Sequence, residues 1–97
     1  MIATMDAAFD SAAQEFQIST EQLKAEGLRL ALTRRLREVD AKIFEITGRY
    51  DIVSVQEMEE KYEAGQIEEA GSWRDYQNLD HLQFKRKRLL DMIGALG

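Results

Sequence analysis

Apolar residues recur every three or four positions along most of the chain, and this spacing predicts helices rather than strands. In the segment 4–16 they are Met5, Ala8, Phe9, Ala12, Ala13 and Phe16. In the segment 20–47 the steps alternate between four and three residues, at Leu32, Leu36, Val39, Ile43 and Ile46. Such alternation is typical of a coiled-coil seam. Both segments are therefore predicted to be amphipathic helices.

Two further helices are predicted in the second half of the chain. A short helix over 55–64 has Met58 and Tyr62 on its apolar face. A long helix over 73–95 carries one apolar stripe, made of Trp73, Tyr76, Leu79, Leu82, Leu89 and Ile93, with Leu96 just beyond it. The chain contains no proline and is rich in good helix formers, which supports helix throughout.

Short polar motifs predict where these helices begin. Ser19 with Gln22 has the form of a capping box, as does Ser54 with Glu57. At the second box, Val53 and Met58 also have the spacing of a hydrophobic staple. Ser72 is predicted to be the N-cap of the last helix.

Glycines predict where two helices end. Gly48 is expected to supply the left-handed residue that closes the helix 20–47, and Gly65 to stop the short helix. Gly27 lies inside the long helix at a cost of about 1 kcal/mol relative to alanine. A close helix crossing would explain Gly27, and simple tolerance is the other explanation.

The predicted fold is an all-α, long antiparallel helical hairpin over 19–97, with the short capped helix in its connection. Residues 1–18 form an N-terminal amphipathic helix or arm. A single hairpin would leave several apolar residues off the main seams with few partners, namely Leu30, Phe44, Phe84, Leu90 and Met92. A symmetric homodimer with a four-helix core would bury them.

The amino-terminal stripe allows three arrangements. Phe9 and Phe16 are separated from the long helix by only a few residues. The segment could cap the bundle of its own chain, or swap onto a dimer partner. It could instead fold into a groove of another protein.

Charge is arranged in blocks, although the net charge is only −5. Residues 51–80 carry nine acidic and two basic side chains, whereas residues 81–97 carry four basic and one acidic. The acidic balance argues against non-specific nucleic-acid binding. The absence of cysteine fits a reducing cytoplasm. The sequence has no signal peptide pattern and no apolar stretch long enough for a membrane span.

No residue pattern indicates an enzyme, a metal site or a cofactor. His81 is the chain's one histidine, and no nucleophile or acid is placed to work with it. The acidic run 57–69 lacks the twelve-residue calcium-loop pattern. We interpret His81 as a surface residue and the acidic run as a solvated face.

Two features are candidates for binding other molecules. Trp73 and Tyr76 are expected to anchor the end of the bundle or to form a partner-binding hot spot. The basic residues Arg34, Arg35 and Arg37 could lie close to the run Lys85, Arg86, Lys87 and Arg88 in an antiparallel hairpin. This basic surface would contact nucleic acid or an acidic protein, or would simply be solvated and paired to nearby carboxylates.

Three stretches carry a resemblance to known proteins: LTRRLREVDAKIFEITGRY, VSVQEMEEKYEAGQIEEAGSW and DYQNLDHLQFKRKRLL. They are similar to small uncharacterised prokaryotic helical proteins, some of which resemble the antitoxin partners of type II toxin–antitoxin pairs. The resemblance implies a small dimer that neutralises a toxin, often an RNase, by masking its active surface. The DNA-binding fold of many antitoxins is not visible here.

The leading hypothesis is therefore a non-enzymatic protein–protein interaction module, antitoxin-like, with a protein partner such as a toxin. The alternative is a nucleic-acid-associated helical dimer that uses the basic clusters.

Overall fold

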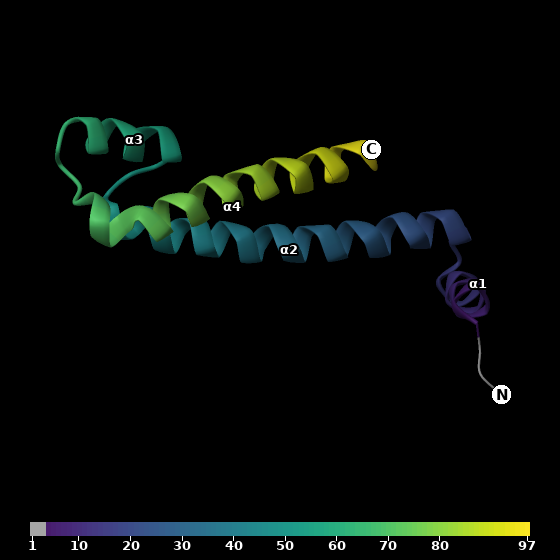
Figure 1. The fold of residues 1–97 in the computed structure, drawn as a ribbon. Coiled ribbons are helices and arrows are strands. Elements are labelled where there is room, and N and C mark those ends of the chain that lie inside the picture. Colours follow the sequence, from purple (N-terminus) through teal and green to yellow (C-terminus); the bar gives the residue numbers. More distant parts are fainter. Residues whose placement is uncertain (1–3) are drawn as a thin grey trace.

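The computed structural model describes residues 4–97, which form four helices (Figure 1). They are α1 (Met5–Phe16), α2 (Thr20–Tyr50), α3 (Val55–Glu63) and α4 (Glu69–Ala95). The two long helices, α2 with 31 residues and α4 with 27, lie antiparallel against each other. The short α3 lies against α4 at the end where the chain turns back. The predicted all-α hairpin with a short helix in its connection is confirmed.

The molecule is long and thin. Its extents are 62 × 30 × 16 Å and its radius of gyration is 19.9 Å, whereas a compact domain of about 100 residues has a radius near 13 Å. A two-helix hairpin can cover only one stripe of each helix. The five residues predicted to lack partners (Leu30, Phe44, Phe84, Leu90 and Met92) are indeed exposed. The chain therefore leaves apolar surface that its own fold does not bury.

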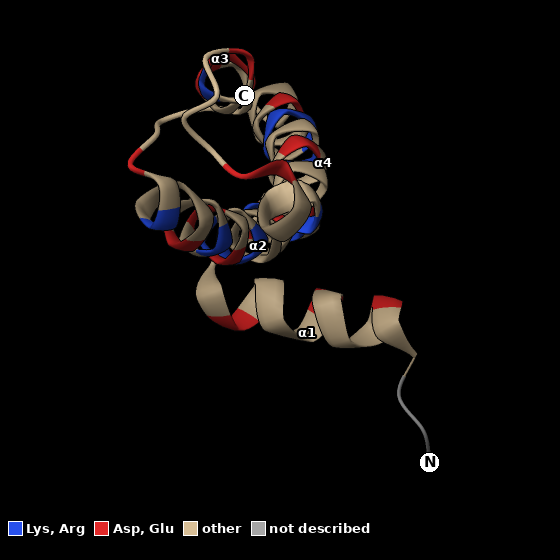
Figure 2. Ribbon diagram, turned by 60° about the vertical axis from the view of Figure 1, so that its left-hand side comes forward, with Lys and Arg blue, Asp and Glu red and all other residues tan. Residues whose placement is uncertain are grey.

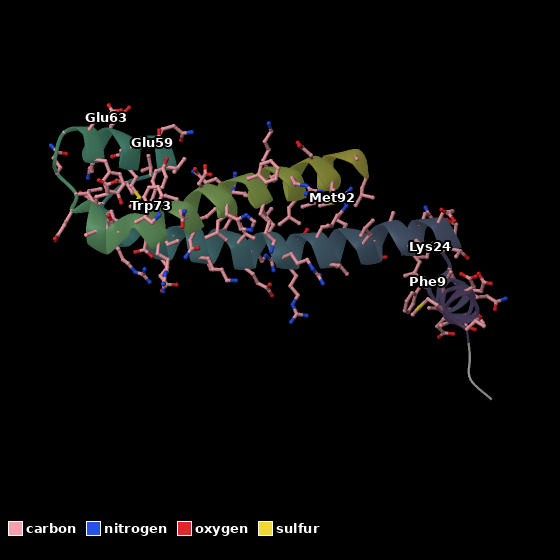
Figure 3. All side chains as sticks on the ribbon, in the orientation of Figure 1. Phe9, Lys24, Glu59, Glu63, Trp73 and Met92 are labelled. Atoms are coloured by element: carbon pink, nitrogen blue, oxygen red, sulfur yellow. The ribbon has the colours of Figure 1, made fainter. Side chains whose placement is uncertain are left out.

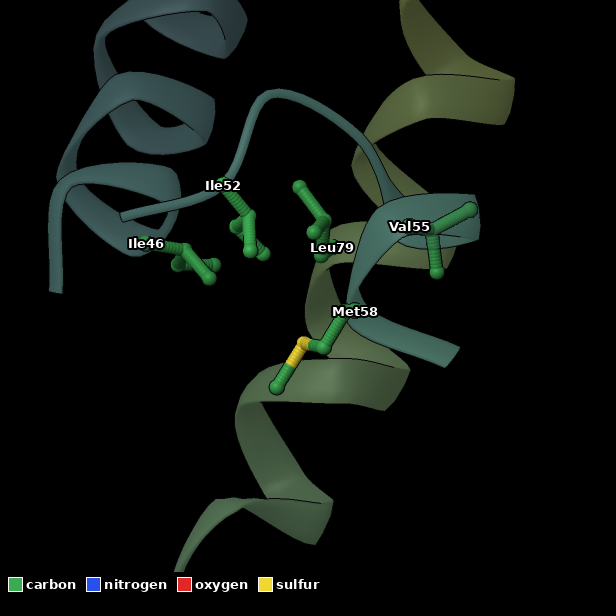
Figure 4. Close-up of a cluster of buried hydrophobic side chains, with 5 residues drawn as sticks. All are labelled: Ile46, Ile52, Val55, Met58 and Leu79. Atoms are coloured by element: carbon green, nitrogen blue, oxygen red, sulfur yellow. The ribbon is translucent and has the colours of Figure 1, made fainter. Parts of the chain in front are cut away.

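The better-packed part of the core lies where α3 joins the hairpin (Figure 4). Its buried side chains are Ile46, Ile52, Val55, Met58 and Leu79. Met58 and Leu79 are completely buried, with 0% exposure. The backbone N–H of Val55 also donates to Gln83 Oε1 at 3.3 Å, which ties the start of α3 to α4. This cluster joins three helices and fixes the turn of the hairpin.

A second cluster runs along the hairpin. Leu32 and Val39 of α2 pack with Leu89 of α4, and half-buried neighbours surround them, namely Leu36, Ile43, Leu82, Ile93 and Leu96. The predicted seam of α2 is thus the face that meets α4. The seam stops near the end of α4, where the Arg29 guanidinium donates to the Gly97 carbonyl at 3.4 Å. The first turns of α2 extend past this point.

The predicted helix starts are partly confirmed. Ser19 and Gln22 form the complete capping box at 2.9 Å in both directions. Ser54 caps α3 by accepting from the Glu57 N–H at 3.1 Å, but the Glu57 carboxylate accepts from the Val53 N–H instead of that of Ser54. The staple between Val53 and Met58 is wrong, because Val53 is 80% exposed. The preceding residue, Ile52, is buried in its place.

Two predicted helix boundaries are wrong, the C-terminal end of α2 and the start of α4. Gly48 does not end α2, which continues to Tyr50 and closes at Asp51 with a φ of 52°. Ser72 is not the N-cap of α4, which begins at Glu69. The Ser72 hydroxyl instead donates back to the Glu68 carbonyl at 2.7 Å and contacts the Tyr62 hydroxyl. Gly65, with a φ of 71°, does follow the end of α3 as predicted.

Helix α1 crosses the beginning of α2 on the side away from α4 (Figures 1 and 2). Thr4 caps α1, Ala13 is its buried residue, and Asp10 accepts from the Thr20 hydroxyl at 3.0 Å. The chain thus places α1 on its own α2, at the opposite end of the hairpin from α3. Of the predicted arm 1–18, residues 1–3 lie outside the described part of the structure.

Candidate partner-binding surface

Three aromatic side chains meet where α3 packs on α4. The rings of Trp73 and Tyr76 are stacked, with centroids 5.5 Å apart and planes at 16°. Tyr62 of α3 meets Tyr76 edge-on, with centroids 5.8 Å apart. Trp73 remains 50% exposed, so it is not buried with the rest of the apolar stripe as its spacing suggested. A half-exposed tryptophan held by a stacked neighbour presents a rigid apolar face to solvent.

Carboxylates surround these rings. Glu59, Glu63 and Glu69 line, together with the three aromatic residues, an open hollow of about 370 Å³. Glu59, Glu63 and Trp73 are labelled in Figure 3 at the α3 end of the molecule. The Tyr76 hydroxyl donates to Glu59, and this hydrogen bond raises the pKa of Tyr76 to about 12. We call this set of six residues the aromatic–acidic surface.

Hydrogen bonds beneath the surface hold its helices in place. Tyr62 contacts the hydroxyl of Ser72, which is 2% exposed and lies inside α4. Asp75 accepts from Arg49 at 3.1 and 3.2 Å and from the Tyr50 hydroxyl at 2.5 Å, which links α4 to the end of α2. Arg49 also pairs with Glu45 at 2.7 Å. The surface therefore lies on helices fixed by both packing and polar contacts.

Sequence reasoning missed these polar contacts. Asp75 lies four residues before Leu79, and Ser72 lies three residues before Asp75. Both are on the stripe of α4 that faces α2 and α3. A polar residue within a buried stripe must find a hydrogen-bond partner. The position of Ser72 and Asp75 on this stripe could therefore have indicated that both have hydrogen-bond partners. It could not have indicated which residues those partners are.

The Asp75 contact makes stability depend on pH above the neutral range. The hydrogen bond from Tyr50 to Asp75, followed by burial, raises the pKa of Tyr50 to about 12, from the usual value near 10. Because the folded state holds this proton more tightly, the stabilisation is fully present below about pH 10 and is lost between about pH 10 and 12. We expect the free energy of unfolding to fall over that range, as measured by urea titrations followed by circular dichroism.

A matched variant isolates Tyr50. In Tyr50→Phe the loss of stability above pH 10 should become smaller, and the tyrosine ionisation seen by near-ultraviolet absorbance should lose a high-pKa component. Tyr76→Phe should remove the second such component. Tyr50→Phe with an unchanged pH profile would contradict the role given to Asp75.

The other predicted partner-binding residues lie far from this surface. Phe9 of α1 is half-buried and lies under Lys24, whose Nζ is 5.9 Å from the ring centroid. Phe16 is exposed. Figure 3 shows Phe9 and Trp73 near opposite ends of the hairpin. The four residues predicted to bind a partner thus divide into two separate surfaces.

The two basic clusters lie at similar levels of the hairpin but do not form one patch. Arg86 of α4 pairs with Asp40 of α2 at 2.7 Å. The run 85–88 therefore lies beside the part of α2 that follows Arg37. Consecutive side chains on a helix are turned by about 100°, so the basic side chains point to several sides. Three other members contact groups of their own helix: Arg34 pairs with Glu38 at 3.7 Å, Arg35 donates to the Ala31 carbonyl at 3.2 Å, and Arg88 lies over the Phe84 ring. Figure 2 shows basic and acidic residues interspersed along both helices.

Other chemistry has little basis in the part of the chain that the structure describes. His81 is exposed and lines a shallow groove between α2 and α4 with Lys42 and Asn78. Within residues 4–97, no three histidine or carboxylate side chains gather as metal ligands would. None of the four described helices is both long and apolar enough to cross a bilayer.

Comparison with known proteins gives one match. No curated protein and no solved structure matches the chain significantly. The model of the family described as "Uncharacterized protein MJ0235 family" matches residues 3–97, nearly the whole length. This agrees with the resemblance to small uncharacterised helical proteins, and it carries no link to antitoxins. The chain therefore belongs to the uncharacterized protein MJ0235 family.

Proposed function

We propose that this chain is a non-enzymatic interaction module that binds a basic surface of a protein partner through its aromatic–acidic surface. The observation that supports this most is the half-exposed Trp73, stacked on Tyr76 and bordered by Glu63 and Glu69. Exposed aromatic residues on a fixed scaffold are typical binding hot spots. Lysine and arginine side chains interact favourably with carboxylates through charge-assisted hydrogen bonds, and with aromatic faces through cation–π contacts.

Charge supports the same choice of partner. The segment 51–80, which contains α3 and the start of α4, carries nine acidic and two basic side chains. Such a surface attracts basic partners and speeds their association. The antitoxin-like form of the proposal comes only from the resemblance of residues 32–90. In that form the partner is an RNase-like toxin, whose phosphate-binding surface would be basic and would be masked by the acidic end of the hairpin.

The nucleic-acid alternative has less support. It requires a continuous basic surface, whereas the basic side chains of α2 and α4 point to several sides, and Arg34 and Arg86 pair with carboxylates. A nucleic-acid complex would nevertheless be recognised by binding that weakens steeply with salt and that is lost when Lys85, Arg86, Lys87 and Arg88 are replaced by alanine.

The proposal predicts that Trp73→Ala weakens the complex with the partner. The product of the neighbouring gene is the first protein to test, by co-expression and by titration of the purified chain. Trp73 is the chain's one tryptophan, so its fluorescence reports binding directly if the partner lacks tryptophan. We expect Trp73→Ala to raise the Kd at least about tenfold, the loss typical of a hot-spot residue. Isothermal titration provides the Kd where fluorescence is lost.

Phe84→Ala is the matched control, because Phe84 is an exposed aromatic of the same helix outside the aromatic–acidic surface. It should change the Kd less than Trp73→Ala does. Glu63→Gln should weaken binding more at low salt than at high salt, since screening already reduces its contribution at high salt. Equal effects of Trp73→Ala and Phe84→Ala would refute this surface as the binding site.

A further inference from the structure

Helix α2 carries a second seam on the side away from α4, which is apolar or glycine except for two arginines at its centre. Its positions are separated by alternating steps of four and three residues, and they are Leu23, Gly27, Leu30, Arg34, Arg37, Ala41, Phe44 and Gly48. Phe44 lies five residues after the buried Val39, which turns it about 140° away from the α4 face. Leu30 is 66% exposed and Phe44 is 78% exposed. We call these eight positions the outer seam.

The outer seam is complementary to itself when reversed. About a point between Arg34 and Arg37, Gly27 is related to Phe44 and Leu30 to Ala41. Leu23 is related to Gly48, but it is already half-buried against α1. Each apolar pair thus joins one large side chain and one small one, as interdigitated layers need. In a parallel pair each position would meet its own copy, which would place Phe44 on Phe44 and leave a void at Gly27. We propose that two copies of this chain form a homodimer through an antiparallel pairing of their outer seams.

A hollow between α1 and α2 would receive the large residue. It measures about 280 Å³, and its lining is apolar throughout: Met5, Ala8, Phe9, Ala12, Leu23 and Gly27. Apart from its chain neighbours and the nearby backbone of α2, a Cβ added at Gly27 would meet no atom of residues 4–97 within 4 Å, so the fold of one chain does not require glycine there. In the antiparallel dimer, Phe44 of the second copy lies opposite Gly27. Its ring enters this hollow, which gives Gly27 a role that one chain alone does not.

The middle of the outer seam is charged, and the same arrangement compensates for part of that charge. Arg34 of each copy meets Arg37 of the other at the centre, where repulsion between like charges lowers the stability of the dimer. Glu38 lies one turn from Arg34 and pairs with it at 3.7 Å within the chain. Antiparallel pairing brings Glu38 of the second copy to Arg34 along the same edge. Arginine at the centre of a seam also opposes other registers, as polar seam residues do in coiled coils.

The dimer would place the long helices in the order α4, α2, α2, α4, with the two aromatic–acidic surfaces at opposite ends. It uses a different face from the proposed partner surface. Each proposal can therefore fail without the other.

Cysteine cross-linking tests the dimer directly, because the chain has no cysteine of its own. In the double variant Gly27→Cys/Phe44→Cys, mild oxidation should give a covalent dimer on a non-reducing gel. Gly27→Cys alone and Phe44→Cys alone are the matched controls and should stay mostly uncrosslinked. Efficient linkage by Phe44→Cys alone would indicate a parallel pair and would overturn the proposal.

A second variant tests the energetics without a cross-link. Phe44→Glu should raise the dimer Kd at least about tenfold in sedimentation equilibrium, since it places a charge in an apolar hollow. Its helix content should not change, because Phe44 is exposed in the single chain. Phe84→Glu should leave the dimer intact. A monomeric wild-type chain at micromolar concentration, or a dimer that resists Phe44→Glu and does not cross-link, would refute the proposed interface.

Discussion

Replacing Leu79 by alanine should lower the free energy of unfolding by about 3 kcal/mol, the middle of the range for a buried leucine. Leu79 is completely buried and packs against residues from α2, the α2–α3 connection and α3. Of the other buried residues in this cluster, Met58 has the most flexible side chain. A chain this small and extended has little stability to spare. The variant should therefore unfold at much lower urea concentration than the wild type, as followed by circular dichroism.

Two controls separate the cavity from a general effect of substitution. Leu79→Met keeps most of the volume and should cost less than half as much. Leu90→Ala lies on the same helix but is partly exposed, at 40%, and should also cost clearly less. If Leu79→Ala and Leu90→Ala were equally destabilising, Leu79 would not have the central position that we assign to it.

The pairing of α2 with α4 could be predicted from sequence because it depends on periodicity. The steps from Leu32 to Ile46 leave one face of α2 for a neighbouring helix, and the structure packs Leu89 against that face. The same reasoning identified exposed residues such as Phe44 and Phe84, because they lie off the seam. Spacing along a helix is a local property, and it does not change when the chain folds.

The C-terminal end of α2 and the start of α4 could not be predicted, because contacts with α3 influence both. The Lys61 ammonium of α3 donates to the carbonyls of Tyr50 and Asp51, at 3.1 and 3.0 Å, beyond the glycine expected to end α2. Asp51 rather than Gly48 then takes the left-handed conformation, which aspartate tolerates better than most residues. Tyr62 of α3 likewise contacts the Ser72 hydroxyl, which is thus unavailable as an N-cap. These contacts join residues distant in sequence.

The candidate surface was predicted only in part for the same reason. Trp73 and Tyr76 were recognised as hot-spot candidates because of their residue type and position. The carboxylates around them were interpreted as a solvated face, since nothing in the acidic run shows that α3 folds back beside Trp73. The docking of α3 converts a run of charges and two aromatic residues into one surface.

Replacing Met58 by alanine should therefore disrupt more than its own contacts. Met58 is completely buried and is the main apolar anchor of α3, so its loss should cost about 3 kcal/mol for the docked state of that helix. We expect α3 and the segment 64–72 to lose protection in amide hydrogen exchange. The seam around Leu32 and Leu89, a separate cluster, should keep its protection.

Met58→Leu retains the volume and should keep α3 docked, while Met92→Ala removes a methionine that is already exposed and should change little. Undocking of α3 would also separate Glu59 from Tyr76 and Tyr62 from Ser72, so Met58→Ala should abolish partner binding at the aromatic–acidic surface while leaving dimerisation through the outer seam intact. An even loss of protection across α2 and α4 would show instead that α3 and the hairpin unfold as one unit. In that case Met58 would support the whole fold, and the aromatic–acidic surface could not be removed without unfolding the chain.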